Sequence, residues 1–95
     1  MLNGNANGFP PLHRDMDRSE WSQVFSAAYD EFCISVDEGE VDGIDPYASQ
    51  SPAEFFAVVS EVFFDLPAML IDAYPQVYDQ LVLFYRQDPL GRRMQ

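Results

Sequence analysis

The stretch "SPAEFFAVVSEVFFD", residues 51–65, decides the fold of this chain. Ser51 can cap a helix, and Pro52 stands at the first helical position, where a missing backbone N–H group is tolerated. The residues that follow are apolar around most of the circumference of such a helix, and a helix of this kind is usually buried against several neighbours. We therefore expect residues 52–65 to form a helix packed inside a helical protein.

Three further segments carry helical signals. Apolar residues across 21–32 recur at i, i+3, i+4, i+7 and i+11, and Ser19 precedes them as a candidate cap. Prolines open two more segments, 67–73 and 75–87, and Asp88-Pro89 is expected to end the second of them. No segment alternates with a period of two for long enough to favour a sheet.

The whole chain is therefore predicted to be all-α, with about four helices in one domain over residues 1–95. Residues 1–18 are rich in Asn, Gly and Pro and lack periodicity, so we expect an irregular N-terminal loop before a helical region at 19–95. The chain is 47% hydrophobic, which is enough for one small core.

Charge and cysteine content restrict the function further. The formal net charge of −11, without a single lysine, would repel a phosphate backbone and argues against direct nucleic-acid binding. No apolar run reaches the roughly 18 to 20 residues of a membrane span, and no secretory signal is recognisable. The one cysteine, Cys33, cannot form an intrachain disulfide, which fits a reducing compartment. We expect a soluble, cytoplasmic chain.

Three carboxylates share one side of the helix expected at 52–65. At about 100° per residue, Glu54, Glu61 and Asp65 fall within roughly 40° of one another. Carboxylates are rarely buried unless they are paired, hydrogen-bonded or bound to a metal. Glu61 and Asp65 can simply line a solvent edge. Glu54 can complete a capping box, in which its carboxylate accepts a hydrogen bond from the backbone N–H of Ser51.

Two other polar groups have alternative interpretations. Tyr47 lies seven residues before Glu54, and its ring can plug the loop or place its O–H near Glu54. In the second arrangement the phenol would stabilise the oxyanion formed when water attacks a metal-bound carbonyl. His13, with Asp15 and Asp17 close by, is a weak metal pattern that we interpret as loop polarity.

The segments "IDPYASQSPAEFFAVVSEVFF", residues 44–64, and "FYRQDPLGR", residues 84–92, resemble the C-terminal part of the Mlc titration factor A family of zinc-dependent peptidases. This resemblance covers essentially the whole chain. It implies that Glu54, in its Pro-Ala-Glu context, is a zinc ligand and that Tyr47 is the assisting phenol. Glu61 shares the helix face and is the second candidate for the ligand.

The resemblance also has a gap. In the family, a His-Glu-x-x-His helix supplies two more zinc ligands and the general base, and no such motif occurs here. The motif would sit just upstream of the part that matches "MLNGN", residues 1–5, so we expect the chain to begin directly after it. By this interpretation the chain alone neither binds zinc tightly nor hydrolyses peptides, because a catalytic zinc takes about three protein ligands.

The resemblance implies peptide substrates, an aminopeptidase preference and the repressor Mlc as a partner. Without the upstream part, we expect much of the surface of Phe55, Phe56, Phe63 and Phe64 to be exposed unless the chain self-associates or repacks. Exposed apolar surface favours self-association, and the high like charge of the chain opposes it. The alternative to a peptidase is a small acidic helical module that binds a basic partner protein without catalysis.

Overall fold

The computed structural model describes residues 11–40 and 43–91, and all regular structure within them is helical. The elements are α1 (Arg18–Asp37), the 3-10 helix η2 (Pro46–Gln50), α2 (Pro52–Asp65), α3 (Pro67–Ala73) and α4 (Pro75–Tyr85). The predicted all-α fold with four α-helices is confirmed. None of these helices is long and apolar enough to cross a membrane.

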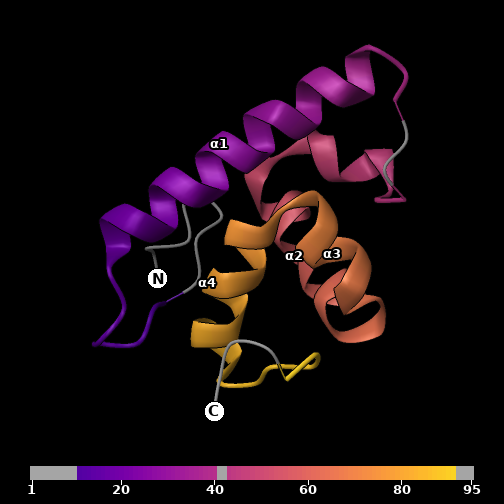
Figure 1. Cartoon of the computed structure of the whole chain (residues 1–95). Coiled ribbons are helices and arrows are strands. Elements are labelled where there is room, and N and C mark those ends of the chain that lie inside the picture. The colour runs from indigo at the N-terminus through magenta and orange to yellow at the C-terminus, as the bar shows by residue number, and fades with distance from the viewer. Residues whose placement is uncertain (1–10, 41–42, 92–95) are drawn as a thin grey trace.

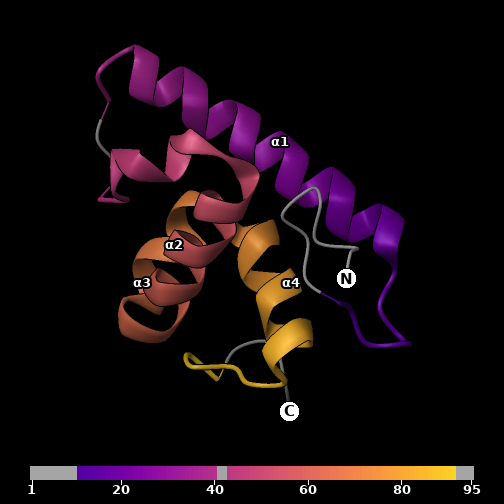
Figure 2. The same cartoon turned by 180° about the vertical axis from the view of Figure 1, so that it is seen from behind.

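The long helix α1 runs diagonally across the rest of the molecule and contacts η2, α2 and α4 (Figure 1). Helix α2 lies between α3 and α4, as the view from the opposite side shows (Figure 2). This arrangement places α2 in contact with every other element. The expectation that the 52–65 helix packs against several neighbours is therefore correct.

The start of α1 differs from the sequence prediction. Asp17, and not Ser19, caps the helix, because its carboxylate accepts a hydrogen bond from the backbone N–H of Glu20 at 3.1 Å. An aspartate cap also places a negative charge at the positive end of the helix dipole, which a serine does not. Ser19 instead lies within the first turn of α1.

The segment before α2, for which the sequence predicts no helix, forms η2. The Asp45 side chain accepts from the backbone N–H of Tyr47 at 3.0 Å, and the Asp45 carbonyl accepts from Ala48 at 2.9 Å. Ala48 is fully buried, and Tyr29 of α1 donates its hydroxyl to the Ser49 carbonyl at 2.7 Å. The dipeptide Asp45-Pro46 thus begins a fixed helical turn that is attached to α1.

Helix α4 ends at Tyr85, two residues earlier than the end at residue 87 that the sequence predicts. Arg86 adopts a left-handed conformation with φ of 57°, which ends the helix at Tyr85. Beyond it, the hydroxyl of Tyr78 donates to the Asp88 carboxylate and accepts from the backbone N–H of Leu90. These hydrogen bonds hold the segment after α4 against the helix that precedes it.

The core is largely aromatic, and Phe55 of α2 lies near its centre. Its ring is 1% exposed. Its ring neighbours come from α1 and from the junction of α3 and α4: Phe25, Tyr29, Phe32 and Tyr74, with centroids 5.5–6.3 Å away. Several aromatic partners around one ring stabilise it beyond simple burial.

The expectation that four phenylalanines of α2 are exposed is wrong in part. Phe55 and Phe63 are almost completely buried, and Phe56 is partly buried against Trp21, Phe25 and Phe84. Only Phe64 is exposed, with 44% of its surface accessible. The described helices bury these rings among themselves, which sequence periodicity alone does not reveal.

Truncating Phe55 tests this packing. We expect Phe55→Ala to lower the free energy of unfolding by about 3–5 kcal/mol, because it leaves a cavity where α1 and α2 meet. Phe64→Ala on the same helix is the matched control and should cost markedly less, because the ring is partly in solvent. Urea unfolding followed by circular dichroism measures both. Equal losses for the two variants would contradict the central position of Phe55.

Candidate functional site

Glu54 lies in the first turn of α2, next to the buried ring of Phe55, and is partly buried. Its backbone N–H donates to the Ser51 hydroxyl at 3.2 Å, which is one half of a capping box. The other half is not formed, because among the described residues the Glu54 carboxylate accepts no hydrogen bond and forms no ion pair. The carboxylate is therefore not used by the cap.

Tyr47 belongs to η2, the element immediately before α2. Its side chain is 54% exposed, so it does not act as a buried plug. Ser51 is both the C-cap of η2 and the N-cap of α2, and the two elements pack closely together. Tyr47 and Glu54 thus come from adjoining, well-anchored turns.

Glu61 and Asp65 are both exposed on α2. Their exposure agrees with the interpretation that they line a solvent edge. Glu54 differs from them in being partly buried at the head of the helix. Of the three carboxylates that the sequence groups on one face, Glu54 is therefore the least accessible to solvent.

Tyr29 holds the turn that carries Tyr47. Its hydroxyl donates to the Ser49 carbonyl, and the Cys33 thiol approaches the same oxygen at 4.0 Å. Burial, together with the neighbouring Cys33 thiol and the Asp30 carboxylate, raises the pKa of the Tyr29 hydroxyl above its usual value of 10.0. Tyr29 therefore stays protonated and can donate at neutral pH.

His13, Asp15 and Asp17, which form the weak metal pattern, each make a contact that stabilises the fold. The Nε2 atom of His13 lies 2.7 Å from the Phe84 carbonyl oxygen, and Asp15 forms an ion pair with Arg86 at 3.1 Å. Asp17 caps α1. The three side chains bind three different partners, which agrees with the interpretation as loop polarity.

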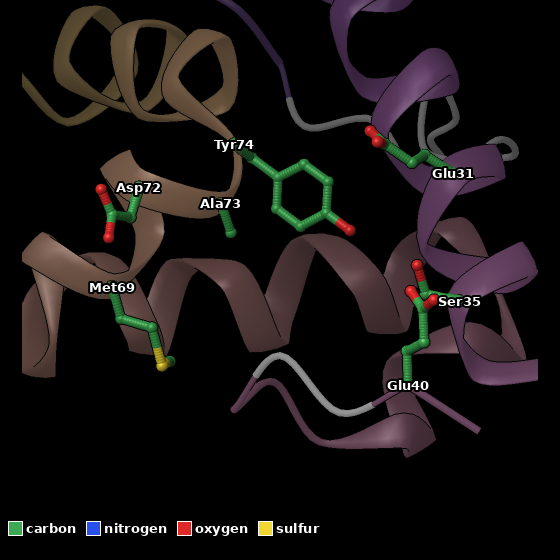
Figure 3. A pocket seen from close by; sticks show the side chains of 7 residues that line it. All are labelled: Glu31, Ser35, Glu40, Met69, Asp72, Ala73 and Tyr74. Atoms are coloured by element: carbon green, nitrogen blue, oxygen red, sulfur yellow. The ribbon is translucent and has the colours of Figure 1, made fainter. Parts of the chain in front are cut away.

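An open pocket of about 460 Å³ lies between α1 and α3 (Figure 3). It is lined by Glu31, Ser35, Glu40, Met69, Asp72, Ala73 and Tyr74. The ring of Tyr74 extends from the end of α3 toward the side chains of α1. Glu54 and Tyr47 are not part of it. Sequence reasoning missed this pocket, since its walls come from separate elements and no local pattern connects them.

The described residues do not by themselves form a zinc site. A catalytic zinc takes about three protein ligands and an open position. Within residues 11–40 and 43–91, no three His, Cys, Asp or Glu side chains are grouped around a position for one ion. Glu54 is a single carboxylate, and a catalytic zinc needs further ligands besides it.

Comparisons with known proteins agree on one family. Residues 1–86 match the family described as glucose-regulated metallo-peptidase M90. The Mlc titration factor A proteins of Yersinia pestis (strain Pestoides F) and Yersinia pseudotuberculosis (serotype O:1b, strain IP 31758) are each 42% identical to the chain over 91 residues. The match covers 94% of this chain and 33% of each relative. The chain thus spans about a third of the length of these curated relatives.

Two substitutions at position 54 test whether the carboxylate belongs to the helix cap. A capping box accepts Gln but not Ala, and both substitutions remove the charge equally. We expect Glu54→Gln and Glu54→Ala to have free energies of unfolding within about 0.5 kcal/mol of each other. Ser51→Ala is the reference and should lose about 1 kcal/mol. If Glu54→Ala were less stable than Glu54→Gln by as much as Ser51→Ala loses, the carboxylate would be part of the cap.

Proposed function

This chain belongs to the glucose-regulated metallo-peptidase M90 family, and we propose that it contributes Glu54 as a zinc ligand and Tyr47 as an oxyanion donor to a larger zinc-dependent peptidase. The observation that carries this proposal is the state of the Glu54 carboxylate. It is partly buried at the head of α2, and no described residue hydrogen-bonds to it. A carboxylate that the fold holds in place without binding it is free to bind a group from outside the described residues.

Glu54 is a better ligand than Glu61 for a physical reason. A metal ligand has to be held in place by its surroundings. Glu54 follows the Ser51 cap and precedes the buried Phe55, so its backbone is fixed on both sides. Glu61 lies seven residues further along α2, about 10 Å away, and is exposed. We therefore propose Glu54 as the ligand and leave Glu61 as the second candidate.

Tyr47 is proposed to act through its phenol. Its backbone is fixed by the Asp45 side chain, and its ring extends into solvent, where a substrate can reach it. A donor placed in advance near a developing negative charge stabilises the transition state, because no reorganisation is needed during the reaction. The O–H of Tyr47 would donate to the oxyanion that forms on the scissile carbonyl.

The chain alone is proposed to be inactive. It offers one candidate ligand, and no three of its described His, Cys, Asp or Glu side chains are grouped so that they could hold one ion. The remaining ligands and the base would come from the polypeptide that corresponds to the rest of the relatives' length. We further propose that the complete enzyme acts on peptides, with a preference for free N-termini.

The partner proposal follows the relatives' name, Mlc titration factor A. We propose that the complete protein binds a repressor of the Mlc type in the cytoplasm. The single Cys33 is compatible with a reducing location, and the net charge of −11 favours a partner with basic groups at its surface.

A second candidate function is an acidic binding module without catalysis. The observation in its favour is the exposure of large apolar side chains, among them Ile34 (58%), Leu66 (56%) and Leu83 (50%). Exposed apolar side chains that gather into a patch mark interaction sites in many proteins. The zinc content of a protein in which the chain is joined to the rest of a relative distinguishes the two candidates. The peptidase would hold zinc through Glu54, and the binding module would not.

The isolated chain gives the first test of the proposal. After incubation with zinc and dialysis, we expect elemental analysis to find far less than one zinc per chain, because a single carboxylate holds the ion too weakly. One equivalent of retained zinc would contradict the proposal that further ligands lie outside the chain.

A hybrid protein gives the second test. Here the chain replaces the matching 91-residue segment of the Yersinia pestis relative. We expect Glu54→Gln to lose both zinc and peptidase activity, whereas Glu61→Gln, the matched control, keeps both. Tyr47→Phe should keep its zinc and its KM while kcat falls about 100-fold, as for loss of one oxyanion donor. Loss of zinc in Glu61→Gln and its retention in Glu54→Gln would reverse the ligand assignment.

A further inference from the structure

Tyr29 lies where α1 meets the two turns that carry the proposed functional groups. Its hydroxyl donates to the Ser49 carbonyl at 2.7 Å, and Ser49 follows Tyr47 by two residues in η2. Its ring contacts the ring of Phe55 edge-on, with centroids 5.6 Å apart, and Phe55 directly follows Glu54 in α2. One side chain of α1 therefore contacts both turns, the first through its hydroxyl and the second through its ring.

The turn that carries Tyr47 depends on contacts from outside itself. It is a 3-10 helix of five residues, and the internal hydrogen bonds of such short helices have poor geometry. Inside it, the Ala48 N–H donates to the Asp45 carbonyl at 2.9 Å, and the Ser49 hydroxyl donates to the Pro46 carbonyl at 2.8 Å. Because more than half of the Tyr47 side chain is exposed, the backbone of η2 largely determines where its O–H lies.

Two groups of α1 approach the Ser49 carbonyl, and only one of them is a strong donor. The Tyr29 hydroxyl is 2.7 Å away, whereas the Cys33 thiol, a weak donor, is 4.0 Å away. Burial raises the pKa of the Tyr29 hydroxyl, so this group keeps its proton and can donate at neutral pH. Of the two contacts to this carbonyl, the Tyr29 hydrogen bond is therefore the one that ties η2 to α1.

We propose that Tyr29 is a positioning residue for peptide hydrolysis and acts through Tyr47, by fixing η2 so that the Tyr47 O–H is placed for the oxyanion. This inference rests on the proposed function of Tyr47 and adds the residue that holds it. A donor stabilises a transition state well only when it is held in advance, and a displacement of about 1 Å can cost much of the rate.

The substitution Tyr29→Phe separates the two contacts of this side chain. It removes the hydroxyl and leaves the ring against Phe55, so the turn of Glu54 keeps its support. Tyr85→Phe is the matched control. The Tyr85 hydroxyl donates to the Ser60 hydroxyl in α2 at 2.9 Å, so this variant loses a phenol hydrogen bond of similar length that does not involve η2.

Amide hydrogen exchange of the 95-residue chain, measured by NMR without zinc, tests whether Tyr29 holds η2. The reporter is the Ala48 N–H, which is bonded within η2, and the Tyr78 N–H on α4 is the reference for wider unfolding. We expect Tyr29→Phe to speed exchange at Ala48 by at least about fivefold relative to Tyr78, because η2 opens more often. Tyr85→Phe should leave this ratio unchanged. The same ratio in the two variants would contradict a specific hold on η2.

Kinetics of the hybrid with the Yersinia pestis relative test the link to catalysis. Tyr29→Phe should lower kcat about tenfold with KM and zinc content unchanged, a smaller loss than for Tyr47→Phe because the Tyr47 phenol is still present. Tyr85→Phe should keep kcat within about twofold. The double variant Tyr29→Phe/Tyr47→Phe should be no slower than Tyr47→Phe alone, because no phenol remains for Tyr29 to position.

Three kinetic results would overturn the proposal. The first is an unchanged kcat in Tyr29→Phe when Tyr47→Phe is slow. The second is a double variant slower than Tyr47→Phe by the full effect of Tyr29→Phe, which would show that the two residues act independently. The third is loss of zinc in Tyr29→Phe, which would show that the hydroxyl supports the turn of Glu54 instead.

Failure of the proposed function gives a different pattern. If Tyr47→Phe keeps its kcat, the oxyanion role of Tyr47 is wrong, and the role of Tyr29 in catalysis is wrong with it. Faster exchange at Ala48 in Tyr29→Phe would then still show that Tyr29 holds η2. Unchanged exchange at Ala48 would refute that hold whatever the kinetics of Tyr47→Phe.

Discussion

The packing of Phe55 into the rings of α1 is the constraint on which the rest of the structure depends. Phe25, Tyr29 and Phe32 approach it from α1, and Tyr74 approaches it from the junction of α3 and α4. Glu54 is the preceding residue in the chain. The contact that fixes the first turn of α2 therefore also fixes the backbone of the proposed ligand, without using its carboxylate.

The acidic residues differ in what the fold already uses them for. Asp17 caps α1, Asp45 caps η2 and Asp15 pairs with Arg86, so each has a structural role. Glu54 is partly buried and has no such partner among the described residues. A carboxylate that the fold positions but does not employ is the kind of group that a function can recruit.

The helices were predictable where their signals are local. Ser51-Pro52 marks the start of α2, and prolines mark α3 and α4, because capping groups and missing N–H groups act within one turn. The start of α1 was misassigned because Asp17 and Ser19 are both good caps. The left-handed Arg86 and the pocket beside Tyr74 had no sequence signal, since they depend on contacts between separate elements. Periodicity grouped Glu54 with Glu61 and Asp65, and family resemblance then favoured Glu54 as the ligand and Tyr47 as the assisting phenol.

The central claim is that the carboxylate at the head of α2 belongs to a metal centre completed by other parts of a larger protein. A crystal structure of the zinc-loaded hybrid, with the metal located by anomalous scattering at the zinc edge, examines it most directly. The account predicts a Glu54 oxygen at about 2.0–2.2 Å from the zinc. A zinc bound without Glu54, whether by Glu61 or entirely by the rest of the protein, would contradict it.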